Sequence, residues 1–568
     1  MGASKPRRRM SHATILPTLF LSCCIANQFL HTGYQVGAIE VVKSENILAA
    51  EKCPTPERQS CKGIPRVLLQ DKNEDPEWSL EDEGQEFNVV EATVESIQEA
   101  FKAGSLTSRS LIELYLQRIE KYDPQLHSII EINPEVWTLA DKADKEREKA
   151  GGFIGGIHGI PILIKDNIGT KDCLNTTAGS FALLGSVVPR DAGVIEKLRK
   201  SGAIILGKAN LSEWANFRSS NSSNGWSARG GQTKSPYVAT ADPCGSSTGS
   251  AVATAANLVT VSIGTETDGS IICPSGRNGV VGIKPSVGLT SRAGVIPIDL
   301  KQDTVGPICR TVADAVEVLD VIVGFDPRDS ATSAGKQWIP SGGYKQFLKS
   351  DGLRGKRLGV LRSPFYDVSN SDEAPTLEKH LNLMRDLGAF ILNNVTFEGL
   401  SAVLEGVIEE TVIQYDFKQD LNAYLTGLVE SPVRSLADVI TFNNENSKLE
   451  SLDLYDQENF YTSENTTGRD SEEYKVASEK FSTLIDGVFR MFEQYKLDAV
   501  IGPSFGGFSS VPALGGYPAI SVPAGYLDGV PFGISFAGVK GSEPTLIEIA
   551  YAFEHATHLR QPPESFGS

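Results

Sequence analysis

The sequence predicts an α/β fold. From residue 151 onward, short apolar runs of strand length alternate with segments of helical length. This alternation is typical of strands and helices that pack against each other in layers. The clearest strands are expected at residues 160–165, 203–206 and 261–264, and the clearest helices at 192–201 and 251–258.

Helices are also expected before this alternating part. The first covers residues 94–103 and should end at Gly104, because glycine readily adopts the left-handed conformation found after a helix. A second helix follows, with Thr107 or Ser108 as its N-cap. It should stop before Pro124, because proline lacks the N–H group that a helix interior requires.

The second half of the chain repeats the alternation less clearly. Strands are expected at residues 357–361 and 499–501, and a helix at 376–387. Residues 326–344 are expected to form a surface connection. The acidic, Asn-rich residues 436–470 are expected to form an excursion near the substrate entrance, although they could also be only a solvated helix pair.

The composition of residues 1–39 predicts a targeting segment and not part of a folded core. Residues 1–39 contain no Asp or Glu, and a basic patch precedes a mostly apolar run, which is typical of a secretory signal peptide. A signal anchor or an organellar transit segment remains an alternative, so the expected location is secretory or extracellular, otherwise endomembrane-anchored or organellar. Residues 40–88 are predicted to be an acidic, flexible lead-in, and residues 89–568 a single domain.

The charge of the chain limits its partners. A formal net charge of −18 repels nucleic acid and anionic membrane surfaces. No apolar run beyond the leader approaches the roughly 20 residues that a membrane-spanning helix needs. We therefore expect no nucleic acid partner, and no membrane attachment except through the leader.

Sequons and cysteines are compatible with the secretory route. Five Asn-x-Ser/Thr sequons occur, at Asn175, Asn210, Asn221, Asn394 and Asn465, of which Asn210 is a candidate for burial. Cys53 and Cys61 could form a disulfide in an oxidising compartment. The remaining internal cysteines show no metal-ligand spacing and are interpreted as small core or pocket-lining residues, namely Cys173, Cys244, Cys273 and Cys309.

Two stretches rich in glycine and hydroxyl side chains are the best candidates for a functional site. Residues 242–250 and 264–274 have little apolar surface to bury, so they can direct backbone N–H groups and hydroxyls at a ligand. Neither stretch has the Gly-Lys-Ser/Thr or Gly-x-Gly-x-x-Gly pattern of phosphate-binding loops. Apolar segments flank both, which argues against a flexible linker. An oxyanion site for acyl transfer is the better interpretation.

Acyl transfer by a serine needs a base, and histidine is a poor candidate here. Only His158 lies near an interesting segment, and a structural role is expected for it. Lys165 instead closes the apolar strand at residues 160–165. A lysine can accept a proton near neutral pH if burial lowers its pKa from the usual value of about 10.4. Strand alternation sends Lys165 and Asp166 to opposite faces, which weakens the alternative that they form an ion pair.

At this point several segments together resemble the amidase signature family of serine hydrolases. The family motifs are matched in order and spacing by residues 159–167, 245–250, 264–271 and 279–285. The resemblance extends roughly from Thr93 to His555 and is closest to plant and fungal probable amidases. It implies a mixed central β-sheet covered by α-helices on both faces, with residues 515–535 as the C-terminal pocket wall.

The resemblance also implies a Ser, cis-Ser, Lys triad without a metal or organic cofactor. Ser270 corresponds to the nucleophile that forms an acyl-enzyme, and Lys165 to the base. Ser246 corresponds to the serine that follows a cis peptide bond and bridges nucleophile and base. Ser247 corresponds to a position that helps to hold the lysine.

The oxyanion hole implied by the resemblance consists of four backbone N–H groups, those of Thr267, Asp268, Gly269 and Ser270. Many family members have Gly at the position of Asp268, but backbone donors survive a side-chain change. Many have Arg or Gln at the position of Ile272, so this chain lacks one possible polar anchor. That difference suggests small or apolar acyl groups.

The predicted function is hydrolysis of a linear carboxylic amide C–N bond through a Ser270 acyl-enzyme, which releases ammonia or an amine. The expected partner is a small-molecule amide. One alternative is a glutamine-amidotransferase-type subunit, which would use the same triad and pass ammonia to a partner; a secretory leader counts against it. The other is a catalytically silent binding protein that keeps the fold. The sequence determines neither the amide nor the oligomeric state.

Overall fold

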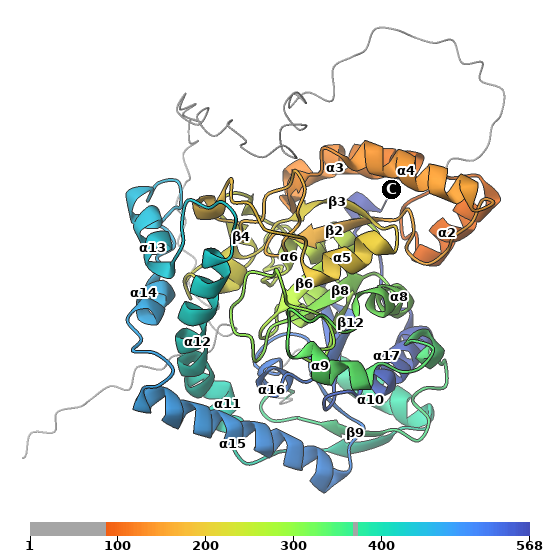
Figure 1. The fold of residues 1–568 in the computed structure, drawn as a ribbon. Coiled ribbons are helices and arrows are strands. Elements are labelled where there is room, and N and C mark those ends of the chain that lie inside the picture. Colours follow the sequence, from red (N-terminus) through yellow and green to blue (C-terminus); the bar gives the residue numbers. More distant parts are fainter. Residues whose placement is uncertain (1–86, 367–372, 568) are drawn as a thin grey trace, which may run out of the picture.

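The computed structural model describes residues 87–366 and 373–567, and its centre is an 11-stranded sheet (Figure 1). The strands in chain order are β1 (Ile129–Ile132), β2 (Pro161–Lys165), β3 (Ile204–Ala209), β6 (Val261–Glu266), β7 (Val281–Lys284), β8 (Thr304–Cys309), β9 (Arg357–Val360), β10 (Phe390–Asn393), β11 (Ala499–Pro503), β12 (Ala519–Leu527) and β13 (Val530–Ala537). Their order across the sheet is β1-β3-β2-β6-β8-β7-β12-β13-β11-β9-β10. β2 is parallel to β3 and β6, and β9 is parallel to β10 and β11, whereas the strands from β6 to β11 pair antiparallel. The sheet is therefore mixed, as expected.

Helices cover both faces of this sheet. Along β2, Ile162 and Ile164 belong to one buried apolar cluster and Leu163 to another, because successive strand side chains point to opposite faces. Helices that contribute to the first cluster include α2 (Val94–Ala103), α5 (Gly193–Lys200), α8 (Val312–Ile322), α10 (Ala374–Asp386) and α17 (Glu543–Thr557), together with two residues of the helix at 108–126. Three complete the second, namely α3 (Ser108–Leu126), α4 (Val136–Lys149) and α6 (Thr248–Ala255). The α/β prediction is confirmed.

A group of helices from the second half of the chain borders the sheet at the left and bottom of Figure 1. Its members are α11 (Leu400–Glu405), α12 (Val407–Thr426), α13 (Leu436–Glu445), α14 (Glu458–Glu464) and α15 (Glu472–Tyr495). The predicted excursion at residues 436–470 contains α13 and α14. A buried contact holds it to the segment that follows β3, because the guanidinium of Arg218 lies between the carboxylates of Glu213 and Glu450. The predicted helix at 376–387 is α10 (Ala374–Asp386).

The N-terminal helices follow their sequence signals except at one end. α2 ends at Gly104, whose φ is +73°, and the Thr107 side chain accepts a hydrogen bond from the N–H of Ser110 at the start of α3. α3 continues through Pro124 to Leu126, so the prediction that it stops before the proline was wrong. Pro124 lies in the last turn of α3, where its missing N–H removes only one hydrogen bond near the helix end.

The segment at residues 326–344 is a surface connection, as predicted, with a few buried anchor points. Most of its residues are exposed or partly exposed, whereas Asp326, Asp329 and Tyr344 are buried, and the segment contains the short helix α9 (Thr332–Gly335). The Arg292 guanidinium pairs with Asp329 at 2.8 Å. The buried Asp329 carboxylate is therefore satisfied by an ion pair formed across a long sequence separation.

The two ends of the described chain lie against each other. Arg560, after α17, forms two hydrogen bonds of 2.7 and 2.8 Å with Glu91, which precedes α2. Arg118 of α3 donates to the carbonyl oxygen of Phe566, and the ring of Phe566 packs edge-on against Tyr122. The C-terminal tail therefore closes the structure against its first helices (Figure 1).

Several predictions concern residues outside the described ranges. These are the leader at residues 1–39, all but the last two residues of the lead-in at 40–88, and the possible pair Cys53 and Cys61. Among the helices that the structure describes, none is both long enough and apolar enough to cross a bilayer.

Candidate active site

Lys165 lies at the end of β2 and is fully buried. Its Nζ donates hydrogen bonds to Oγ of Ser246 at 2.8 Å, to Oγ of Ser247 at 3.0 Å and to the carbonyl oxygen of Thr265 at 3.0 Å. Asp166, the next residue, takes its hydrogen bonds from a different loop. The lysine is therefore bound to the two hydroxyls of the first glycine-rich stretch and is not paired with its neighbouring carboxylate.

Burial makes this lysine a competent base near neutral pH. It lowers the pKa of Lys165 from 10.5 to about 7, because a low-dielectric interior disfavours the charged form. The carboxylates of Glu266 and Asp303 act in the opposite direction and favour the ammonium. At pH 7 a large fraction of Lys165 is consequently neutral and can accept a proton.

The two glycine-rich stretches meet at this lysine. The Gly245–Ser246 peptide bond is cis, as the resemblance implied. The N–H of Ser247 donates to the carbonyl oxygen of Ser270 at 3.1 Å, which ties the second stretch to the first. Ser246 is fully buried, whereas Ser270 is 8% exposed, so Ser270 is the one that a substrate can reach. Among the described residues, the Ser270 hydroxyl makes no hydrogen bond to Ser246 or Lys165.

The backbone before Ser270 forms a tight turn with free donors. Gly269 has φ +76°, and a Cβ there would come within 2.9 Å of the Ser509 hydroxyl, so glycine is required. In the part of the chain that the structure describes, the N–H groups of Asp268, Gly269 and Ser270 donate to no protein acceptor. Unused donors at such a turn can stabilise an oxyanion.

Side chains fix this turn from outside. The hydroxyl of Thr267 donates to Asp303 at 2.5 Å, and the hydroxyl of Ser510, in the short helix α16 (Ser510–Leu514), donates to Asp268 at 2.6 Å. Burial raises the pKa of Asp268. Ile272, at the start of α7 (Ile272–Arg277), is 1% exposed and packs in an apolar cluster. Its apolar character therefore has a packing reason in addition to any effect on substrates.

The two buried histidines of the described chain have structural hydrogen-bond partners. His158 is buried and hydrogen-bonded to Glu146 at 3.1 Å, which agrees with its expected structural role. His380 binds the backbone carbonyl of Ala524. No group of three or more His, Cys, Asp or Glu side chains in the described residues is arranged to hold a metal ion.

Comparison with known proteins decides the family. A family profile described as Amidase matches residues 110–510. The chain belongs to the amidase family. A probable amidase of Arabidopsis thaliana is 54% identical over 484 residues, which are 84% of this chain and 92% of that protein. The X-ray structure of native peptide amidase from Stenotrophomonas maltophilia is similar with a TM-score of 0.78 and 43% identity, and covers 84% of this chain and 98% of its own. A glutamyl-tRNA(Gln) amidotransferase subunit of Thermoanaerobacter pseudethanolicus is 31% identical over 85% of this chain and 99% of that protein.

Two further buried charges lie beside the site of this amidase, and the sequence patterns above did not indicate them. The Glu266 carboxylate accepts the N–H groups of Ile271 at 2.6 Å and Ile272 at 2.9 Å. Lys284 ends β7, donates to the carbonyl oxygen of Tyr517 at 2.6 Å, and has its pKa lowered by burial to about 8. The signal that identified Lys165, a charge that closes an apolar strand, is present at Lys284 as well.

A disulfide joins the two glycine-rich stretches of the amidase site. It links Cys244, in the first stretch, to Cys273, in the second, with the Cα atoms 5.9 Å apart. Both residues are buried, as expected for core or pocket-lining cysteines, but no sequence pattern indicated that they are paired. Cys173 is also disulfide-bonded, whereas Cys309 is free and buried as expected. The pairing could not be predicted because it depends on how two distant loops meet, not on cysteine spacing.

Proposed function

We propose that this protein is a serine amidohydrolase in which Ser270 is the nucleophile, Ser246 the relay and Lys165 the base. The hydrogen bond of 2.8 Å between Lys165 Nζ and Ser246 Oγ carries this proposal. It is supported by the lowered pKa of Lys165, by the residual solvent access of Ser270, which fully buried Ser246 lacks, and by the family of the chain.

In the first half-reaction, the Ser270 hydroxyl attacks the carbonyl carbon of the amide and gives its proton to Ser246. Ser246 gives its own proton to neutral Lys165, which becomes an ammonium. The oxygen that becomes negative is stabilised by the free N–H groups of the turn at Asp268, Gly269 and Ser270. The C–N bond then breaks, and the leaving nitrogen takes a proton back from Lys165 through Ser246.

In the second half-reaction, water hydrolyses the ester on Ser270. The same relay removes a proton from the attacking water and returns one to the Ser270 oxygen when the ester bond breaks. The products are a carboxylic acid and ammonia or an amine. Because Lys165 starts and ends neutral, the cycle needs no external base.

The proposed substrate is a linear carboxylic amide. The similarity to peptide amidase makes peptide amides the first class to test, with simple aliphatic and aryl amides beside them. The suggestion of small or apolar acyl groups rested on Ile272, and the burial of that side chain leaves it without independent support.

The two alternatives have weaker support. An amidotransferase-type subunit would use the same three residues, but that relative is 31% identical whereas the Arabidopsis thaliana amidase is 54% identical. A silent binding protein would not need a buried lysine with a lowered pKa in contact with a serine hydroxyl, and burial of an amine lowers stability.

We further propose a location in the secretory pathway or outside the cell, with an endomembrane or organellar location as the alternative. The disulfide between Cys244 and Cys273 supports an oxidising compartment. Exposed sequon asparagines are Asn221, Asn394 and Asn465. Asn210 is fully buried, and its side-chain amide donates to groups on the surrounding loops, so a glycan there is incompatible with this fold.

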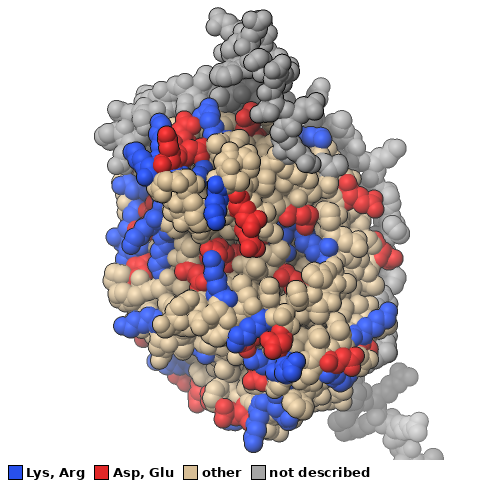
Figure 2. All heavy atoms as spheres, turned by 90° about the vertical axis from the view of Figure 1, so that its right-hand side faces the viewer, with Lys and Arg blue, Asp and Glu red and all other residues tan. Residues whose placement is uncertain are grey.

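The proposed partner is a small-molecule amide rather than nucleic acid. On the face shown in Figure 2, basic and acidic side chains are interspersed and do not gather into a basic patch. Together with the net charge of −18, this distribution disfavours attraction of a polyanion on that face.

Covalent labelling tests the proposal directly. Intact-mass analysis of the purified full chain with a fluorophosphonate should show one label on Ser270, no label in Ser270→Ala and slower labelling in Lys165→Met. A panel of amides, analysed for acid and amine products, identifies the substrate class. A folded wild-type protein that neither takes the label nor hydrolyses any amide would contradict the proposal.

A further inference from the structure

Asp303 lies beside the turn at residues 267–270, which carries the free N–H groups of the proposed site. Glu266 at the end of β6 pairs with Thr304 at the start of β8. The residues one step beyond this pair, Thr267 and Asp303, therefore lie side by side. The Asp303 side chain is 7% exposed, and its Oδ1 accepts the Thr267 hydroxyl at 2.5 Å. The first residue of the turn is thus bound to a buried carboxylate.

The second carboxylate oxygen of Asp303 holds a loop. Its Oδ2 accepts the N–H groups of Ile298 at 2.9 Å and Asp299 at 3.2 Å. Both belong to the loop at residues 292–303, which is part of the connection between β7 and β8. Arg292 closes this loop, because its Nη1 donates to the carbonyl oxygen of Asp303 at 3.0 Å. The two oxygens of one carboxylate therefore join the loop to the turn, and three donors offset the cost of burying its charge.

The same loop also holds the chain next to the proposed base. The N–H of Ile296 donates to the carbonyl oxygen of Asn167 at 2.9 Å, two residues after Lys165. The Asn167 side-chain amide donates to the Thr265 hydroxyl at 2.9 Å, and the Thr265 carbonyl oxygen accepts a hydrogen bond from Lys165 at 3.0 Å. The loop at residues 292–303 is therefore bonded both to the turn with the free donors and to the segment that follows the base.

We propose that Asp303 is a positioning residue for the amidase reaction. Through the Thr267 hydroxyl, it holds the N–H groups of the turn where the oxyanion forms, at a fixed place relative to Lys165. It acts through Thr267 and not on the substrate itself. This inference rests on the proposed function, in which Ser270 attacks the amide. Donors that are fixed before the reaction stabilise the oxyanion without a cost for moving them into place.

The charge of Asp303 also acts on the base. Burial lowers the pKa of Lys165, and the carboxylates of Glu266 and Asp303 partly offset that effect because they favour the ammonium. Burial raises the pKa of Asp303 itself to about 6, so this carboxyl is mostly ionised at pH 7. The other charged groups that interact with it are Arg292, which favours its ionised form, and Asp299. Loss of the Asp303 charge should therefore lower the pKa of Lys165 further.

The rate at which a fluorophosphonate labels Ser270 in the full chain tests this inference without knowledge of the natural substrate. At pH 9 Lys165 is mostly neutral, so the second-order rate constant reports the geometry of the site. Thr267→Val removes the hydroxyl that binds Asp303. It should lower this rate constant by about 10- to 100-fold, because a displacement of about 1 Å can cost up to about 100-fold. Thr267→Ser, which keeps the hydroxyl, should recover most of that loss.

The pH profile of labelling distinguishes this role from a merely structural one. Asp303→Asn removes the charge, so Lys165 should stay neutral to lower pH than in wild type. At pH 6 this variant should therefore keep a larger fraction of its own pH 9 rate than wild type keeps. The final extent of labelling gives the folded fraction of each variant, so that a loss of stability does not count as a slower reaction.

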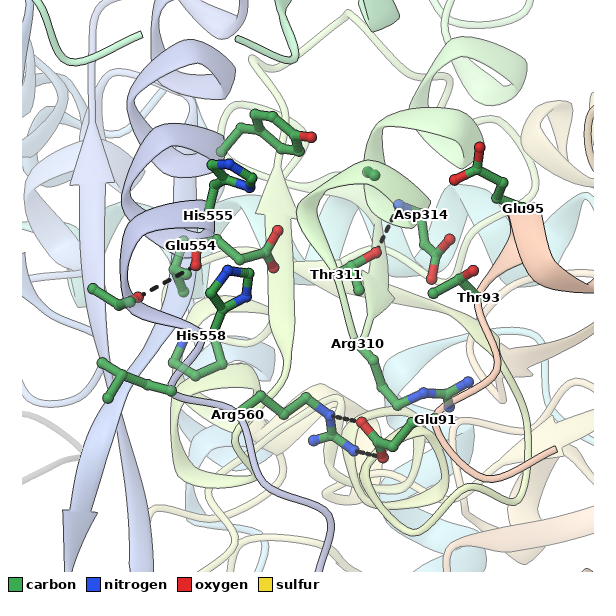
Figure 3. Close-up of a pocket in the computed structure, with 16 residues that line it drawn as sticks. Glu91, Thr93, Glu95, Arg310, Thr311, Asp314, Glu554, His555, His558 and Arg560 are labelled. Carbon is green, nitrogen blue, oxygen red and sulfur yellow. Dashed lines mark hydrogen bonds and ion pairs between the residues drawn. The ribbon is translucent and has the colours of Figure 1, made fainter. Parts of the chain in front are cut away.

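Asp314→Asn is the matched control. Asp314 is also buried, burial likewise raises its pKa to about 6, and it accepts the N–H of Val94 at 2.9 Å. It belongs to α8, however, and its carboxyl points toward the start of α2 beside Thr93 (Figure 3). The cavity that it lines, of about 350 Å³, contains none of the proposed catalytic residues. Asp314→Asn should therefore change neither the rate at pH 9 nor the pH profile.

Three results would each overturn the inference. They are a wild-type rate for Thr267→Val at pH 9, a loss in Thr267→Ser as large as that in Thr267→Val, and an unchanged pH profile in Asp303→Asn. If Asp303→Asn fails to fold, the two Thr267 variants decide. A folded wild-type protein that takes no label would contradict the proposed function as well, whereas normal labelling with an unaffected Thr267→Val contradicts the positioning role alone.

Discussion

Lys165 and Lys284 offer a comparison of two regions that sit close together in the same sheet. Each lysine ends an apolar strand and is fully buried. Burial lowers the pKa of Lys165 to about 7 and that of Lys284 to about 8. Their partners differ, because Lys165 donates to two serine hydroxyls whereas Lys284 donates to the backbone carbonyl of Tyr517.

These different partners suit Lys165 to act as a base and Lys284 to act as a counter-ion. Lys284 faces the carboxylates of Glu266, Asp268 and Glu543, which favour its charged form, and its carbonyl partner cannot carry a proton onward. Lys165 contacts a hydroxyl that can both take and give a proton. Burial alone creates a lysine with a lowered pKa; the neighbouring hydroxyl makes that lysine useful for catalysis.

The largest expected effect comes from removing each lysine in turn. Lys165→Met should lower kcat by about 10²- to 10⁴-fold, because it removes general acid–base catalysis. Lys284→Met should keep kcat within about tenfold, but it should lower the free energy of unfolding by about 3–5 kcal/mol, because Glu266 loses a buried counter-ion. Steady-state kinetics and chemical denaturation of both variants measure these effects.

A result in which Lys284→Met, once folded, loses as much activity as Lys165→Met would remove the distinction between the two sites. The active-site concentration is best determined by fluorophosphonate titration, so that unfolded protein does not count as inactive enzyme.

The disulfide between Cys244 and Cys273 joins the two glycine-rich stretches that surround Lys165, so its removal should affect the Lys165 site more than the Lys284 site. The double variant Cys244→Ser/Cys273→Ser should lower kcat more than it raises KM, since a displacement of one catalytic loop by about 1 Å can cost up to about 100-fold. The free energy of unfolding should fall by about 3.6 kcal/mol, as expected for a disulfide that spans a sequence separation of 29 residues. Cys309→Ala, which alters the free buried cysteine, serves as the control and should change kcat little.

The pH dependence of activity tests which lysine is the base. With Lys165 as the base, kcat/KM should fall about tenfold per pH unit below about pH 7 and be level above it, because only the neutral amine accepts a proton. Glu266→Gln removes a carboxylate that favours the ammonium, so it should move this limb to lower pH. Glu554→Gln removes a partly buried carboxyl on α17, which is not in contact with Lys165, and should leave the limb in place. A limb near pH 8 that Glu266→Gln does not move would point to another group.

The smallest expected effect concerns Asp268. Asp268→Gly removes the hydrogen bond from Ser510 but keeps the backbone donors of the turn. It should therefore change kcat/KM by about two- to tenfold, the effect of one ordinary hydrogen bond. A loss comparable to that of Lys165→Met would show that the side chain takes part in the reaction. Initial rates on the best amide of the panel provide the measurement.

Local patterns in the sequence were sufficient for the strands that position the site. The apolar runs expected at 160–165, 203–206 and 261–264 correspond to β2, β3 and β6 within a few residues. Each run is short and mainly apolar, and a polar residue follows it within two positions, so its length and its end are both visible in one window. The prediction that a strand-ending lysine meets the glycine-rich stretches came from the family resemblance, and the contact of Lys165 with Ser246 agrees with it.

Features that depend on distant partners could not be predicted in this way. Asp329 looks like an exposed turn residue until Arg292 is placed beside it. The link between Cys244 and Cys273 depends on two loops that meet only in the folded sheet. Glu266 lies inside a motif whose hydroxyl and glycine residues give the clearer signal, and its role appears only when the N–H groups that it accepts are known. In each case the missing information is the identity of a contact across the fold.

The closure of the tail against the first helices has a consequence for how the protein is made. Translation produces α2 and α3 early, but Arg560 and Phe566, which dock on Glu91, Arg118 and Tyr122, are synthesised only after every strand of the described sheet. β7 likewise gains β12 as its neighbour only late in synthesis. The first helices of the nascent chain must therefore remain without these final partners until the strands of the sheet have been made.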